Sequence, residues 1–224
     1  MKKTERRMQI ETPKGGVSAV WNDPQDAIGA LVIAPGAGST LDHPFLDGFT
    51  DAITDRQVQV LRFNFLYKEL GRKAPDPEAT LREVWLAAFG EAMLRAKGGV
   101  FAGGKSLGGR IASMCVADGM PAAGLVFLGY PLHPPGKPER IRDAHLPKIQ
   151  VPMLFIQGTR DPFAKPELLG GVLKRLGDGA ELVPIEGGDH SFRVPGKKTP
   201  DAEIGAALAE PAADFIRRVT EGNR

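Results

Sequence analysis

Short apolar runs and longer amphipathic stretches alternate along most of the chain. The apolar runs are rich in Val, Leu, Ile, Phe and Ala, and turn-forming Gly, Pro or polar residues follow them, as is typical of buried strands. The predicted strands are residues 29–34, 58–65, 100–102, 124–128, 153–157 and 180–185, of which 29–34 and 124–128 are expected to be buried. Before them, a looser alternation over residues 8–21 surrounds a Pro-Lys-Gly-Gly turn and predicts an antiparallel opening hairpin.

Apolar residues at helical spacing lie between these strands. The predicted helices are residues 43–57, 78–97, 166–176 and 201–219, together with one that starts over residues 111–116. Pro211 should kink or divide the last of them. Strands that alternate with helices predict an α/β fold with a mostly parallel, doubly wound sheet and helices on both faces. We find no repeat or linker, and therefore expect a single domain over residues 1–224.

Composition and charge narrow the function classes. The net charge of +2 gives no electrostatic case for nucleic acid, and the one dense basic cluster, at residues 2–7, is expected to be a solvated end. No stretch approaches the roughly 18 apolar residues of a membrane span, and the first residues lack the apolar run of a signal peptide. We therefore expect a cytoplasmic protein without membrane contact. The single cysteine, Cys115, is expected to be a buried thiol, and the dispersed histidines predict neither a metal site nor a cofactor.

The Gly-rich corner after the strand at residues 100–102 carries the main candidate chemistry. Residues 104–108, Gly-Lys-Ser-Leu-Gly, match G-x-S-x-G, the nucleophile elbow. This spacing follows from chemistry, because a serine on a sharp strand-to-helix turn needs neighbours without a Cβ two residues away. The overlapping residues 99–106 also match the phosphate-binding P-loop, G-x-x-x-x-G-K-[ST]. The corner alone therefore allows a serine hydrolase or a nucleotide hydrolase.

The residues that follow later strands favour the hydrolase. Ligands of parallel α/β sheets collect at the carboxyl ends of the strands, where Ser106, Asp161 and His190 are expected. Their chain order is that of α/β-hydrolases. Ser106 would be the nucleophile, His190 its base and Asp161 the group that orients the imidazole. Asp189 is a rival to Asp161, but we expect it to be a local turn residue.

The P-loop interpretation conflicts with its context. Three of its four variable positions, residues 100–102, belong to the predicted strand, whereas a phosphate cradle should follow the strand. The neighbouring apolar strand at residues 124–128 is followed by Gly-Tyr-Pro and supplies no aspartate for Mg²⁺.

Other residues are candidates for supporting roles. The backbone N–H groups of Leu107 and Ala37 are the predicted oxyanion donors, with Gly38 as the substitute for Ala37. Four further side chains are candidates for substrate contact: Lys105, Arg160, His43 and His133. The first two would form a cationic rim for a carboxylate-bearing substrate, although Lys105 could instead pair with a carboxylate. For each histidine a structural hydrogen-bonding role is favoured over substrate contact.

With these residues assembled, the whole chain resembles an α/β-hydrolase. It is most similar to a small, capless family that includes bacterial predicted hydrolases, a testis-expressed vertebrate protein and a subunit of the NSL histone acetyltransferase complex. The resemblance lies in the following segments: residues 36–38 with 43–44, 60–63, 103–110, 129–135, 157–161 and 188–192. It is similar only in outline to dienelactone hydrolases, which have cysteine at the position of Ser106, so their activity does not carry over.

The sequence therefore predicts a serine hydrolase of the carboxylesterase or thioesterase type, acting on a small ester or thioester. The loop at residues 130–147 stands where many relatives insert a helical cap, so we expect no cap domain and an open cleft. The sequence leaves open whether the chain forms a homo-oligomer. The alternative from another class is a non-catalytic scaffold or complex subunit, because some eukaryotic relatives have that role.

Overall fold

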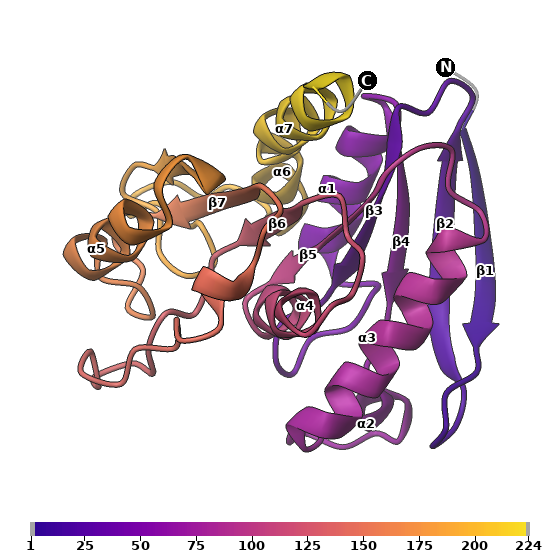
Figure 1. The fold of residues 1–224 in the computed structure, drawn as a ribbon, viewed down its shortest axis with the longest axis horizontal. Coiled ribbons are helices and arrows are strands. Elements are labelled where there is room, and N and C mark those ends of the chain that lie inside the picture. Colours follow the sequence, from indigo (N-terminus) through magenta and orange to yellow (C-terminus); the bar gives the residue numbers. More distant parts are fainter. Residues whose placement is uncertain (1–2, 223–224) are drawn as a thin grey trace.

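The chain forms one eight-stranded sheet in this computed structural model, which describes residues 3–222. Figure 1 shows the strands running through the molecule with helices beside them. The strand order is β1-β2-β4-β3-β5-β6-β7-β8. β1 and β2 pair in antiparallel fashion, β2 is antiparallel to β4, and all other neighbours are parallel. The strands are β1 (Lys3–Ile10), β2 (Val17–Pro24), β3 (Gly29–Ala34), β4 (Val58–Phe63), β5 (Val100–Lys105), β6 (Leu125–Leu128), β7 (Met153–Gly158) and β8 (Ala180–Ile185).

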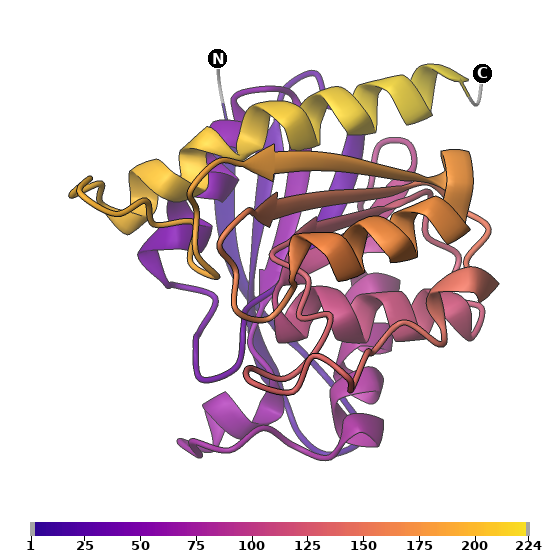
Figure 2. The ribbon, with the colours of Figure 1, turned by 90° about the vertical axis from the view of Figure 1, so that its left-hand side faces the viewer.

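Helices cover both faces of the sheet, so the predicted doubly wound fold without a cap domain is confirmed. Helices α3, α4 and α5 pack on one face, and α1, α6 and α7 on the other, each over its own apolar core. In Figure 2 the yellow α7 lies above the strands while the orange α5 and magenta α4 lie below them. The helices are α1 (Pro44–Thr54), α2 (Leu66–Glu69), α3 (Glu78–Met93), α4 (Leu107–Ala117), α5 (Pro166–Leu176), α6 (Asp201–Ala207) and α7 (Ala209–Gly222), with short 3₁₀ turns at Leu146–Lys148 and Gly177–Gly179.

The predicted final helix is divided, as Pro211 suggested. The break lies at Leu208, between α6 and α7, which places Pro211 in the first turn of α7. A proline ring collides with the carbonyl four residues earlier in a helix, here that of Ala207, and this is the last residue of α6. In the first turn the missing N–H costs little, because those donors have no partner within the helix.

Two short segments differ from the sequence prediction. The strand predicted to reach Phe65 ends at Phe63, and the four-residue helix α2 follows it, which the hydrophobic pattern did not indicate. The basic cluster, predicted to be a solvated end, is exposed over residues 3–7 as expected, but these residues form part of strand β1; residue 2 lies outside the described range. Lys3 pairs with Asp51 and Asp55, and Arg7 with Asp42. Charged side chains on an edge strand discourage pairing with other chains.

The remaining physical expectations concern Cys115 and the membrane. Cys115 is a buried free thiol, as predicted, and burial raises its pKa to about 12. Among residues 3–222, no helix combines the length and the apolar character that crossing a bilayer requires.

Candidate active site

Ser106 occupies a sharp corner between β5 and α4. Its φ of 50° and ψ of −111° lie where few side-chain-bearing residues occur, so the backbone is strained. Glycines make the corner possible because α4 and the strands approach so closely. A Cβ on Gly104 would lie 2.6 Å from the backbone of Gly108, and one on Gly108 would lie 2.3 Å from the carbonyl oxygen of Ala34. The sequence motif thus reflects the packing that holds the hydroxyl above the sheet.

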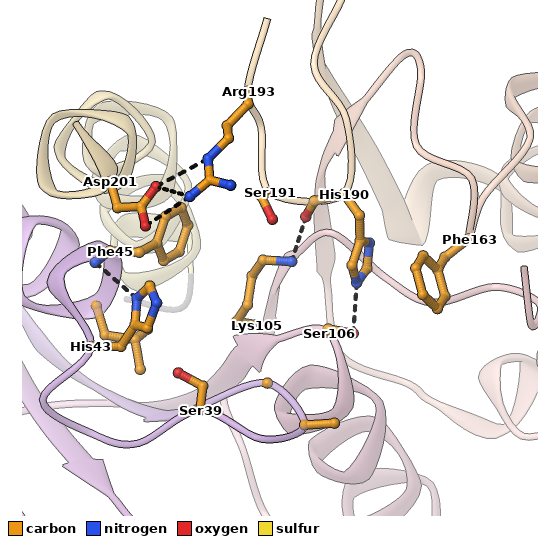
Figure 3. A pocket seen from close by; sticks show the side chains of 13 residues that line it. Ser39, His43, Phe45, Lys105, Ser106, Phe163, His190, Ser191, Arg193 and Asp201 are labelled. Atoms are coloured by element: carbon orange, nitrogen blue, oxygen red, sulfur yellow. Dashed lines mark hydrogen bonds and ion pairs between the residues drawn. The ribbon is translucent and has the colours of Figure 1, made fainter. Parts of the chain in front are cut away.

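His190 and Asp161 extend a line of hydrogen bonds from this serine. His190 Nε2 is 2.8 Å from Ser106 Oγ, and His190 Nδ1 is 2.7 Å from Asp161 Oδ2. A carboxylate only accepts hydrogen bonds, so Nδ1 carries the ring proton and Nε2 is free to accept the serine proton. Figure 3 shows the imidazole pointing toward Ser106. The Phe163 ring stacks on the imidazole, with 4.1 Å between the ring centroids.

The Asp161 side chain is fully buried, and the protein satisfies both of its oxygens. Oδ1 accepts the backbone N–H of Phe163 at 2.7 Å, while Oδ2 accepts Gln157 Nε2 at 2.5 Å in addition to the imidazole. Gln157 Oε1 in turn accepts the backbone N–H of Tyr130 at 2.8 Å. Gln157 therefore connects the aspartate loop to the segment after β6.

Replacing Gln157 with Leu is expected to lower the free energy of unfolding by about 1–3 kcal/mol, because it leaves the buried N–H of Tyr130 without a partner and removes one of the three hydrogen bonds to the buried Asp161. Urea unfolding followed by tryptophan fluorescence measures this loss. Gln150→Leu is the matched control, since Gln150 is exposed, and it should change stability by less than about 0.5 kcal/mol. Equal effects of the two substitutions would contradict this role of Gln157.

Asp189 forms a local turn, as the sequence analysis expected of this rival to Asp161. Its Oδ1 accepts the backbone N–H groups of Ser191 and Arg193 at 2.8 and 2.9 Å. The carbonyl oxygen of His190 accepts a hydrogen bond from Lys105 Nζ at 2.5 Å. A turn closed by Asp189 and a lysine from β5 thus fix the loop that carries the histidine.

A pocket of about 310 Å³ opens beside Ser106 and His190 (Figure 3). Its walls come from the loop after β3, the start of α1, the elbow, the His190 loop and the start of α6. The lining residues are Gly36, Ala37, Ser39, His43, Phe45, Leu46, Lys105, Ser106, Phe163, His190, Ser191, Arg193 and Asp201. The lining combines apolar groups, such as Phe45 and Leu46, with charged and hydroxyl groups.

Of the two predicted oxyanion donors, Leu107 directly follows Ser106 and Ala37 lines the pocket. Leu107 is the first residue of α4, so its N–H has no partner within the helix, although its side chain is not part of the pocket lining. Ala37 lines the pocket in the loop after β3. Gly38, the substitute for Ala37, donates its N–H to Tyr67 Oη at 3.0 Å. The structure thus removes Gly38 as the donor and favours Ala37.

The candidates for substrate contact separate into two groups. Lys105 and His43 line the pocket, although His43 also caps α1 by accepting the Phe45 N–H on Nδ1 at 3.2 Å. His133 is buried away from the pocket, where Nε2 accepts the Lys165 N–H and Nδ1 is 3.0 Å from the Pro134 oxygen. Arg160 is exposed and lines a separate hollow beside Gly187 and Lys197. The expected cationic rim therefore does not include Arg160.

The fold contradicts the phosphate-loop interpretation of residues 99–106. Residues 100–105 form strand β5, which pairs with β3 on one side and β6 on the other. A strand inside a sheet cannot curl around a phosphate, because its N–H groups are used by its neighbours. Within residues 3–222, no three His, Cys, Asp or Glu side chains gather in a way that could hold a metal ion.

Comparison with known families agrees with this geometry. The α/β hydrolase domain family matches residues 27–217, which is most of the chain. The chain belongs to this family.

Solved structures show how closely this hydrolase domain follows known folds. The dienelactone hydrolase of Anabaena variabilis superimposes with a TM-score of 0.76 at 20% identity, over 97% of this chain and 99% of that one. An α/β serine hydrolase without a lid from Xanthomonas campestris superimposes with a TM-score of 0.72 at 16% identity, over 97% of this chain and 95% of that one. An α/β serine hydrolase homologue from Coxiella burnetii also has a TM-score of 0.72, at 17% identity over 95% of this chain and 96% of that one. At these identities the similarity establishes the fold alone.

Proposed function

We propose that this α/β hydrolase cleaves a small ester or thioester through a serine nucleophile and an acyl-enzyme intermediate. The observation that supports it most is the unbroken set of hydrogen bonds from Ser106 through His190 to the buried Asp161. A pocket opens at its serine end, so a carbonyl carbon would have room beside Oγ.

Acylation follows from the roles of these atoms. Ser106 Oγ attacks the carbonyl carbon while its proton moves to His190 Nε2, and Asp161 stabilises the imidazolium. The carbonyl electrons move to the oxygen, which the N–H groups of Leu107 and Ala37 would bind. When the tetrahedral intermediate collapses, His190 gives the proton to the leaving alcohol or thiol, and the acyl group stays on Ser106.

Deacylation repeats the cycle with water as the nucleophile. His190 takes a proton from the water, whose oxygen attacks the acyl carbon, and the same backbone donors hold the second oxyanion. Return of the proton to Ser106 Oγ releases the carboxylic acid. The mechanism uses groups of this chain alone, and we propose that no cofactor takes part.

The substrate should be small or flexible. The pocket volume of about 310 Å³ suits a short acyl group, and the segment after β6 is a loop rather than a helical cap. We further propose that the protein acts in the cytoplasm, and that neither nucleic acid nor membrane is its partner.

A fluorophosphonate probe, which reacts covalently with activated serines, tests the proposal directly. Native protein should be labelled, and labelling should disappear in Ser106→Ala and in heat-denatured wild type. Absence of labelling, together with no turnover of short p-nitrophenyl esters, would favour the non-catalytic scaffold that the narrower resemblance leaves open.

A further inference from the structure

Lys105 is the charged side chain of the pocket that has no carboxylate partner. None of the ion pairs formed within residues 3–222 includes it. Its Nζ donates one hydrogen bond, to the carbonyl oxygen of His190 at 2.5 Å, and lies 5.5 Å from the centroid of the Phe192 ring. An ammonium has three N–H donors, so two remain for a ligand.

The surroundings of Lys105 disfavour a cation with no partner. Burial lowers the pKa of its ammonium to about 8, although the charges of Asp161 and Asp189 act in the opposite direction. Asp161 already accepts three hydrogen bonds and makes no direct contact with the lysine. A desolvated charge without a counter-ion is costly in a protein interior, and such groups in pockets are candidates for ligand binding.

The other cation of the pocket is already neutralised. Arg193 makes a bidentate pair with Asp201, with Nη2 2.8 and 3.0 Å from the two carboxylate oxygens. The buried Arg62, on the strand β4, likewise pairs with Glu5 and Asp47. The fold therefore supplies carboxylates to these arginines and leaves the lysine next to the candidate nucleophile without one.

We propose that the substrate carries a carboxylate on its acyl chain and that the Lys105 ammonium binds this carboxylate. The inference rests on the proposed function, because the acyl chain is defined by attack of Ser106. The hydroxyl groups of Ser39 and Ser191 line the same pocket and are additional donors for the anion (Figure 3).

Two features select an acyl carboxylate. A single ammonium matches the single charge of a carboxylate, whereas a phosphate dianion would leave excess negative charge near Asp161 and Asp189. Figure 3 shows Lys105 and Phe163 on opposite sides of His190. His190 must reach the leaving group to protonate it, so the leaving group fits the Phe163 side. The acyl chain then lies on the side of Lys105 and of α1.

Paired esters test this assignment. Monoethyl succinate and ethyl 4-methylpentanoate have acyl chains of nearly equal shape, and only the first is charged. In Lys105→Met the ratio of kcat/KM for the acidic ester to that for the neutral ester should fall about 10- to 100-fold, mainly through KM. Lys105→Arg, which keeps the charge, should restore part of the ratio.

Lys148→Met is the matched control, because Lys148 is exposed on the 3₁₀ turn at Leu146–Lys148 and its loss changes the net charge equally. It should leave the ratio within about twofold. If Lys105→Met lowers kcat for both esters equally and leaves the ratio unchanged, the lysine only positions His190 and the proposal is wrong.

The same ratio should depend on pH. Lys105 is charged below about pH 8 and neutral above it, so the wild-type ratio should fall as pH rises through this value. In Lys105→Met the fall of the ratio near pH 8 should be absent. The other charged or titratable groups that line the pocket or act on this lysine are Asp161, Asp189, His190, His43, Arg193 and Asp201. Their effect on the catalytic steps is common to both esters and cancels in the ratio, whereas any effect of their charge on the substrate carboxylate is also present in Lys105→Met, which is therefore the reference for the wild-type profile.

A binding measurement separates failure of this inference from failure of the proposed function. Calorimetry with Ser106→Ala should detect succinate, and Ser106→Ala/Lys105→Met should bind it at least about tenfold more weakly. Succinate binding without fluorophosphonate labelling would support the anion site and refute the hydrolase. Labelled wild type with no acidic preference and no succinate binding would refute the anion site alone. Binding of inorganic phosphate in preference to succinate would also overturn it.

Discussion

Replacement of Ser106 by Ala is expected to lower kcat/KM for a small ester by about 10⁴- to 10⁶-fold. The substitution removes the only atom of the proposed mechanism that forms a bond to the substrate, while the backbone donors and the pocket walls stay in place. Initial rates with p-nitrophenyl acetate, measured at high enzyme concentration, detect the remaining turnover. The thermal unfolding midpoint should change by less than about 3 °C, since the substitution removes one half-buried hydroxyl.

The double variant gives the sharper form of this prediction. His190→Ala alone should cost about as much as Ser106→Ala, and the two together should cost hardly more than either one. Groups that act as one unit are not additive, because the serine is a poor nucleophile unless the imidazole accepts its proton. The 2.8 Å hydrogen bond between them is the structural basis for this coupling.

Independent effects would contradict the mechanism. If the two substitutions multiply their losses, or if each reduces kcat/KM only a few fold, then the Ser106–His190 hydrogen bond is not part of the chemistry. Losses of only a few fold would further favour a protein that kept the hydrolase fold for another purpose, such as a scaffold in a complex.

The three residues of the candidate site could be predicted from the sequence because each stands next to a recognisable local pattern, a glycine motif or the end of a strand. A serine between two glycines, Gly104 and Gly108, marks a corner where backbones nearly touch, and such contact forbids side chains. Asp161 and His190 follow apolar strands, and parallel strands bring their carboxyl ends to one edge of a sheet. The structure places both side chains within hydrogen-bond distance in the expected order.

Contacts between distant loops were not predictable in this way. Gln157 supports Asp161 from the end of β7, and Tyr67 of α2 holds Gly38, but neither residue type by itself marks a supporting role. The direction of a loop side chain depends on tertiary packing that the hydrophobic pattern does not encode. This is why Arg160, next to Asp161 in the sequence, and His133, which follows β6, lie outside the pocket.

The crossing of α1 and α6 is a further feature that the sequence pattern did not indicate. A Cβ on Gly48 of α1 would lie 1.9 Å from the carbonyl oxygen of Ala202, and one on Gly205 of α6 would lie 2.0 Å from that of Phe45. The two helices therefore pack backbone against backbone. Both helices have their N-terminal ends at the pocket, where the N-cap His43 and Phe45 of α1 and Asp201 of α6 are lining residues.

Gly48→Ala is expected to lower the free energy of unfolding by about 2 kcal/mol or more, because a methyl group at this crossing must push the helices apart. In an isolated helix the same change would be favourable by about 1 kcal/mol. Gly90→Ala is the matched control, since Gly90 lies within α3 and a Cβ there would meet nothing within 4 Å. It should raise stability by about 0.5–1 kcal/mol.

Urea unfolding should therefore show a lower free energy of unfolding for Gly48→Ala and a higher one for Gly90→Ala. Changes of the same sign in both variants would refute the close crossing.

The helix crossing also affects the candidate active site. Separation of α1 from α6 moves the pocket wall but leaves the Ser106–His190–Asp161 hydrogen bonds on other elements. Gly48→Ala protein that is still folded should therefore raise KM for the ester more than it lowers kcat. A loss confined to kcat would mean that this helix pair supports the reacting groups rather than the substrate.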